Sequence, residues 1–100
     1  MKEINDWQED VLAQPLVLVD FWASWCTPCK TMLPILERFE EQTEGLQVIK
    51  IDADANPDLV AQLEVSSIPT MILYKQGEQV WTLNGGKPLS VLTEKVKPYI

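Results

Sequence analysis

The stretch VDFWASWCTPCK, residues 19–30, holds both cysteines of this chain of 100 residues, Cys26 and Cys29. It overlaps a nearly continuous apolar run, Leu16–Trp22, which is the pattern of a strand covered on both faces of a sheet. Apolar residues then recur at helical spacing over Pro28–Thr43, beside charged ones. The sequence therefore predicts that the cysteine pair lies where a buried central strand leads into a helix.

The segments on either side of this stretch alternate between strand and helix patterns. The predicted strands are Lys2–Ile4, Leu46–Asp52, Thr70–Lys75 and Gln79–Leu83, and the predicted helices are Asn5–Ala13, Pro57–Leu63 and Leu89–Val96. Asn5 or Asp6 is the expected cap of the first helix. The last two strands should form an antiparallel hairpin around residues 76–78. This alternation is typical of an α/β fold with a mixed sheet.

Composition limits the class of protein. Eight basic and fifteen acidic residues give a formal charge of −7, and such a surface repels phosphate backbones, so no nucleic-acid partner is expected. No run approaches the roughly 18 apolar residues of a membrane span, and the first residues lack the apolar segment of a signal peptide. We expect a cytoplasmic protein without a membrane partner, folded as a single domain over residues 1–100, although a chain whose leader had been removed would look the same.

Three interpretations of the cysteine pair can be weighed from the residues. A structural disulfide across so short a ring contributes only about 2 kcal/mol by the loop-entropy relation, so it would be a weak brace. Structural zinc normally takes four Cys or His ligands, whereas the sequence has no histidine and no second cysteine pair, so no metal is expected. A Cys-x-x-Cys motif that enters a helix directly after a buried strand is typical of a thiol redox site, which is the favoured interpretation.

The helix start gives the two cysteines different roles in a redox site. Unpaired backbone N–H groups and the positive end of the helix dipole stabilise a thiolate in the first turn. We therefore expect a lowered pKa for Cys26 and assign it as the nucleophile. Cys29, one turn further in and more buried, is expected to stay a thiol until it resolves the mixed disulfide.

Several separated motifs share one resemblance. VDFWASWCTPCK, KIDADANP, SSIPT and NGG, at matching intervals, resemble the thioredoxin family over almost the whole chain. The resemblance implies a thioredoxin fold, a five-stranded mixed sheet flanked by four helices. It also implies dithiol–disulfide exchange that reduces disulfides of target proteins, with electrons from a thioredoxin reductase or an equivalent donor. We expect a monomer with no cofactor beyond its redox-active disulfide, serving electron transport and cell redox homeostasis.

Asp20 lies inside the apolar strand, six residues before Cys26. Burying a carboxylate without a partner costs several kcal/mol, so the pKa of Asp20 should rise unless its strand end reaches water. The resemblance assigns Asp20 as the acid or base that exchanges a proton with Cys29. Lys50 matches the lysine that accompanies this aspartate in the family and tunes it, although a lysine here could instead extend to solvent.

Residues further along the chain are implied to bind the target. The resemblance makes the Ile68–Pro69 bond cis, in a loop facing the cysteines, where the backbone N–H and C=O of Ile68 can pair with an extended segment. Gly85 matches the family's glycine that forms one wall of the substrate groove. From the residues alone, Asn84 and the two glycines after it could be no more than a turn.

The residues beside Cys26 form the expected contact surface. Trp25 and Pro28 offer a flat apolar area next to the nucleophile. Thr27 stands where most members of the family carry glycine, and this departure from the family pattern bears on the redox potential. A hydroxyl hydrogen bond to the Cys26 thiolate would stabilise the reduced state and make the protein a stronger oxidant.

Two other functions remain open from the sequence. One is a disulfide-forming oxidase or isomerase of the same fold, which a measured potential would distinguish. The other is a thioredoxin-fold binding module of a larger complex, whose role would not depend on turnover. The acidic run DADANPD is expected to serve loop and helix capping rather than cation binding.

Overall fold

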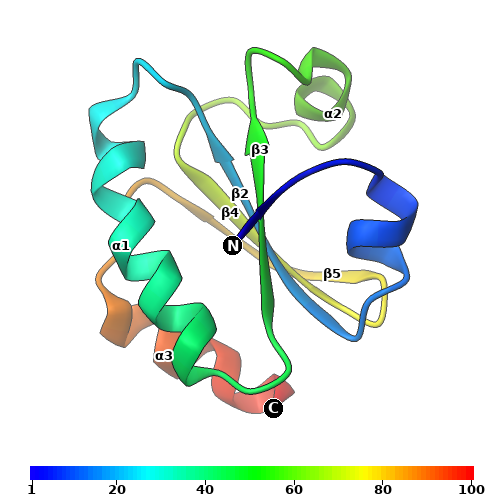
Figure 1. Ribbon diagram of the computed structural model, residues 1–100, viewed down its shortest axis with the longest axis vertical. Coiled ribbons are helices and arrows are strands. Elements are labelled where there is room, and N and C mark those ends of the chain that lie inside the picture. Colours follow the sequence, from blue (N-terminus) through cyan, green and yellow to red (C-terminus); the bar gives the residue numbers. More distant parts are fainter.

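A five-stranded mixed sheet forms the centre of the computed structural model, which describes residues 1–100 (Figure 1). The strands are β1 (Lys2–Glu3), β2 (Leu16–Trp22), β3 (Gln47–Asp52), β4 (Thr70–Lys75) and β5 (Glu78–Asn84). Their order is β1-β3-β2-β4-β5, so the apolar strand β2 is central, as predicted. β1 and β2 run parallel to β3, whereas β4 runs antiparallel to both β2 and β5.

Helices cover both faces of this sheet. They are α1 (Thr27–Gln42), α2 (Pro57–Gln62), α3 (Leu89–Val96), a π-helical segment η1 (Gln8–Leu12) and a final 3-10 turn η2 (Lys97–Tyr99). α1 and α3 lie on one face, and α2 and η1 on the other (Figure 1). None of them has the length and apolarity that a membrane crossing requires. The predicted α/β architecture is confirmed.

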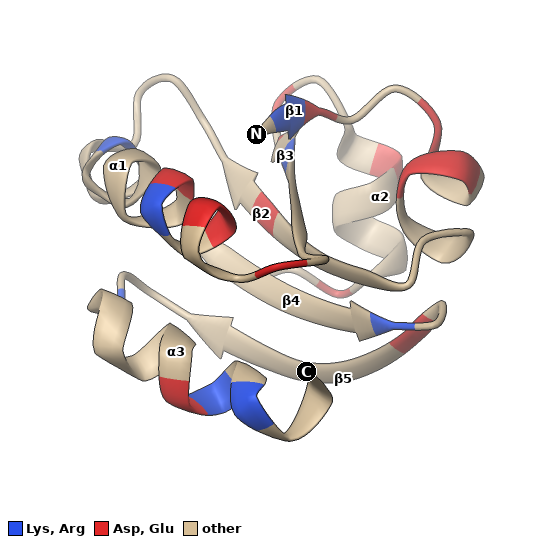
Figure 2. Cartoon of the chain, turned by 60° about the horizontal axis from the view of Figure 1, so that its bottom comes forward, with Lys and Arg blue, Asp and Glu red and all other residues tan.

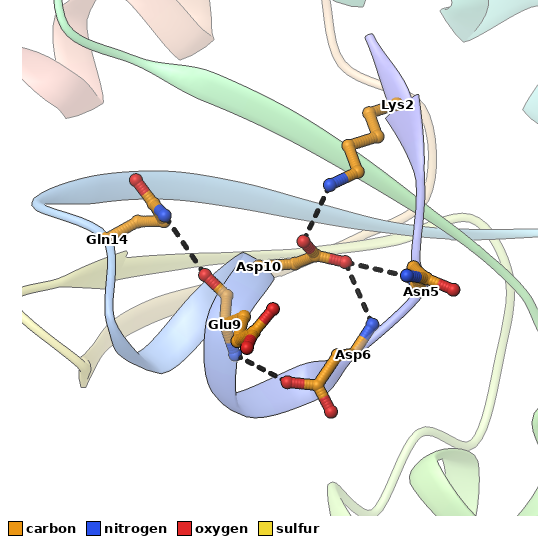
Figure 3. A network of polar contacts seen from close by, with 6 residues as sticks. All are labelled: Lys2, Asn5, Asp6, Glu9, Asp10 and Gln14. Carbon is orange, nitrogen blue, oxygen red and sulfur yellow. Dashed lines mark hydrogen bonds and ion pairs between the residues drawn. The ribbon is translucent and has the colours of Figure 1, made fainter.

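The first helix is shorter than the predicted Asn5–Ala13, because side chains replace its opening turn. The backbone N–H groups of Asn5 and Asp6 both donate to Asp10 Oδ2, at 2.8 and 3.0 Å (Figure 3). Asp6 Oδ2 in turn accepts from the N–H of Glu9 at 2.9 Å, which is the capping bond expected of Asp6. The side chain of Asn5 makes no capping bond. The helical segment is confined to η1, Gln8–Leu12.

The two faces of β2 pack into two separate cores. Leu16 and Leu18 belong to the core under α1 and α3, while Val17 and Val19 belong to the core under α2 and η1. Side chains alternate along a strand, so Asp20 continues the row of Leu16 and Leu18 toward the α1 side. Charged residues otherwise lie mostly on helices, loops and strand ends (Figure 2). The sheet thus carries a buried acid directly upstream of the cysteines.

Candidate active site

The two cysteines form a disulfide at the start of α1. Cys26 is the N-cap residue of the helix and Cys29 lies in its first turn, with their Cα atoms 5.3 Å apart. The backbone N–H of Cys29 donates to Cys26 Sγ at 3.2 Å. Both side chains are buried, Cys29 more completely. Because a helix-start N–H points at the Cys26 sulfur, this position favours negative charge on that atom once the disulfide is reduced.

Segments distant in sequence meet beside the disulfide. Ile68 packs against the cluster formed by the two cysteines and Ala23, and the Ile68–Pro69 peptide bond is cis, as expected. The backbone N–H of Gly85 donates to the C=O of Pro69 at 2.8 Å, which ties the end of β5 to this loop. The structure therefore brings together three of the predicted binding residues, Ile68, Pro69 and Gly85.

Gly85 is required by its backbone conformation rather than by crowding. Its φ angle is +82°, in the left-handed region that glycine adopts without strain. A Cβ atom built on Gly85 would meet nothing nearer than Lys87 Nζ, at 3.8 Å. The turn interpretation and the groove-wall interpretation are therefore compatible, since the turn leaves an open surface beside Pro69.

Two hollows flank the cysteine pair. One, of about 460 Å³, lies between the start of α1 and the β5–α3 loop, and Thr27, Pro28 and Met32 line it. The other, of about 360 Å³, is lined by Trp25 and Ile68 among mainly apolar residues. Trp25 is 67% exposed, whereas every other aromatic residue is buried or partly buried. The disulfide therefore lies between two shallow surfaces that can receive a polypeptide.

Asp54 was not foreseen as part of this surface. Its Oδ2 accepts from Trp25 Nε1 at 2.8 Å, which fixes the plane of the exposed indole. The sequence places Asp54 in the DADANPD run, where Asp52 Oδ1 accepts from the backbone N–H groups of Asp54 and Ala55, the expected loop role. No group of three or more His, Cys, Asp or Glu side chains is arranged to hold a metal ion.

Asp20 is completely buried, at 0% exposure, so the alternative of a strand end that reaches water is wrong. Neither carboxyl oxygen has a hydrogen-bond partner in the protein. Burial raises the pKa of Asp20 from 3.8 to about 7; the charge of Lys50 acts in the opposite direction and that of Glu3 in the same direction. Asp20 can therefore both hold and release a proton near neutral pH.

Lys50 lies beside Asp20 in the sheet but pairs elsewhere. The two residues are register neighbours on β3 and β2, yet Lys50 Nζ lies 3.4 Å from Glu3 Oε1 and 5.1 Å from the centre of the Trp22 ring. No ion pair joins it to Asp20, and its side chain is 21% exposed. Glu3 is a second residue that the sequence reasoning missed, because no local pattern marks the partner of a lysine one strand away.

A disulfide at a helix start, beside a buried acid and an open apolar surface, is the arrangement found in thiol–disulfide oxidoreductases. The family model for thioredoxin matches residues 1–98. A thioredoxin of Listeria monocytogenes is 42% identical over 102 residues, covering 100% of this chain and 99% of its own. A bifunctional thioredoxin reductase/thioredoxin of Mycobacterium leprae is 48% identical over 77 residues, covering 76% of this chain and 17% of its own.

Solved structures agree with these relatives. A mutant thioredoxin from Halobacterium salinarum superposes with a TM-score of 0.90 at 34% sequence identity, covering 99% of this chain and 88% of that one. The chain belongs to the thioredoxin family. It is a protein-disulfide reductase that performs dithiol–disulfide exchange through its cysteine pair.

Proposed function

We propose that Cys26 is the attacking sulfur and Cys29 the resolving one. The Cys26 thiolate attacks one sulfur of a target disulfide, the target's other sulfur leaves as a thiolate, and a mixed disulfide forms. Cys29 then loses its proton and attacks Cys26 Sγ, which releases the second target thiolate and closes the Cys26–Cys29 disulfide. Two electrons pass from the dithiol to the target, and no cofactor enters this balance. The position of Cys26 as helix cap, 3.2 Å from the N–H of Cys29, carries the assignment.

Asp20 is proposed to receive the proton that Cys29 gives up, through an intervening water molecule. Neither oxygen of the carboxyl group has a protein partner, so both are free to accept a proton. A pKa of about 7 leaves enough of the ionised form at neutral pH to act as the base. Lys50 tunes this proton affinity through its positive charge.

The target is proposed to bind across the two hollows. Its extended chain pairs with the backbone of Ile68 next to Pro69, and passes over the open surface at Gly85. Trp25, Thr27 and Pro28 contact its apolar side chains. An exposed indole fixed by a hydrogen bond suits such a contact, because little side-chain entropy is lost when the target binds.

The electron donor is proposed to be a thioredoxin reductase. The Mycobacterium leprae relative, which joins the two activities in one chain, supports this pairing.

A disulfide reductase works only where its dithiol is regenerated, which favours a reducing cytoplasm. We expect the protein to act in the cytoplasm as a monomer. Sedimentation of the reduced protein tests this oligomeric state.

Reduction of insulin disulfides tests the sulfur assignments. We expect no turnover from Cys26→Ser, and no turnover from Cys29→Ser either, but only the latter should accumulate a mixed disulfide with its targets. Equal, negligible insulin reduction by the wild type and by Cys26→Ser would instead favour a binding module. Mixed disulfides formed through Cys29 in the Cys26→Ser variant would contradict the proposed order of attack.

Thr27 is proposed to make the protein more oxidising than a glycine at the same position. Its hydroxyl can donate to the Cys26 thiolate, which stabilises the reduced form. We expect the potential of Thr27→Gly, measured against a glutathione redox buffer, to be lower than that of the wild type. An equal or higher potential in Thr27→Gly would reject this role.

A further inference from the structure

Three charged residues form one row across the edge of the sheet. Glu3 on β1 and Lys50 on β3 are register partners, and so are Lys50 and Asp20 on β2. Register partners project from the same face of a sheet, so the row runs from the half-exposed Glu3, through Lys50, to the buried Asp20. The exposed fraction of the side chain therefore falls at each step inward along the row.

Lys50 has two acidic neighbours but contacts only the outer one. Its Nζ lies 3.4 Å from Glu3 Oε1, whereas neither oxygen of Asp20 has any partner. The register neighbour of Asp20 on β4 is Met71, and α1 contributes the buried Cys29 and Met32 to this side of the sheet, none of them charged in the oxidised protein. Lys50 and Glu3 are therefore the charged groups that act on Asp20.

The choice of partner matters for the proton chemistry. A lysine paired directly with a buried carboxylate favours the ionised form and makes that carboxylate a weak base. A lysine that pairs with a second carboxylate stabilises the buried carboxylate less, because the second carboxylate offsets part of the lysine's positive potential. In this protein the second carboxylate is Glu3, which contacts Lys50 from the more exposed end of the row.

We propose that Glu3 is a positioning residue of the redox reaction, which holds the Lys50 ammonium away from Asp20 and so keeps Asp20 able to take the proton of Cys29 near neutral pH. This inference rests on the proposed role of Asp20. Glu3 does not touch the reacting sulfurs; it acts through Lys50.

The test is the pH dependence of the resolving step in Glu3→Gln. We expect the midpoint of this profile, and of the Asp20 carboxyl titration followed by carbon-13 NMR, to move down by about 0.5 pH unit, since an unopposed Lys50 favours the Asp20 carboxylate. Glu44→Gln removes the same charge from an exposed loop position and serves as the matched control, with no shift expected.

A double-variant comparison separates positioning from simple charge. In a Lys50→Met background, Glu3→Gln should shift the midpoint by less than half as much, because Glu3 no longer has a lysine to hold. Equal shifts in both backgrounds, or none in the wild-type background, would overturn the inference. A pH profile that Asp20→Asn leaves unchanged would instead remove the proposed role of Asp20, so the two failures are distinguishable.

Discussion

Asp10 and Asp20 are both buried aspartates, and their pKa values move in opposite directions. Asp10 accepts from Lys2 Nζ at 2.7 Å and from two backbone N–H groups (Figure 3). The hydrogen bond from Lys2, followed by the backbone ones, lowers the pKa of Asp10 from 3.8 to about 2. Asp20 has no partner, and burial raises its pKa to about 7.

The difference shows that hydrogen bonds and the depth of burial together decide the charge of a carboxyl group in this fold. At Asp10 the bonds stabilise the carboxylate, and the carboxylate in turn organises the turn before η1. At Asp20, burying a carboxyl group without a partner costs folding free energy, but it leaves a group that can change its protonation state. One aspartate therefore serves stability, and the other is available for proton transfer beside the cysteines.

The largest expected effect is on stability at Asp20. Its folded-state pKa lies above the ordinary value of 3.8, so the folded wild type binds more protons and loses stability as pH rises from about 4 to about 7. Asp20→Asn escapes this loss and should be more stable by about 4 kcal/mol above that window, with the pH-dependent part of the gain absent at about pH 4. Urea unfolding at both pH values checks this, and a difference independent of pH would contradict it.

Asp10→Ala should act in the opposite direction. The variant loses the Lys2 pair and leaves the N–H groups of Asn5 and Asp6 without their acceptor, so we expect a loss of about 2 kcal/mol at neutral pH. Because the pKa of Asp10 is lowered, its contribution is present above 3.8 and is lost as pH falls through about 2. A thermal unfolding series from neutral to acidic pH should show the two proteins converge. A gap that stays constant would mean that packing, not charge, is responsible.

Activity should distinguish the two aspartates as well. Asp20→Asn removes the proton acceptor and should slow the resolving step at least about tenfold at neutral pH. Asp10→Asn should leave that rate unchanged, since Asp10 contacts no residue of the cysteine site. Single-turnover reduction of a disulfide peptide measures both. Equal slowing in the two variants would indicate a shared loss of structure rather than proton transfer.

The smallest expected effect is at Lys2. Its side chain is 54% exposed, so solvent screens the pair with Asp10, and Lys2→Met should cost less than about 1 kcal/mol. The cost should disappear in an Asp10→Ala background, as a double-variant cycle can show. A large cost in that background would assign Lys2 a role independent of Asp10.

The parts of this structure that follow from local patterns could be predicted from the sequence. β2 and α3 have the predicted bounds, because an unbroken apolar run and a helical period each determine their own element. The first helix was predicted too long, because side chains turn back on the backbone there and no periodicity reveals this. Glu3 was not foreseen either, since its contact with Lys50 depends on strand pairing distant in sequence.

Carbon-13 NMR titration of the carboxyl groups of Asp10 and Asp20 in the oxidised protein tests the central claim most directly. We predict that Asp20 titrates with a midpoint of about 7 and that Asp10 stays ionised down to about pH 2. If both groups titrated together near 3.8, the contrast between a partnered and an unpartnered carboxyl group would fail. The proton acceptor proposed for Cys29 would fail with it.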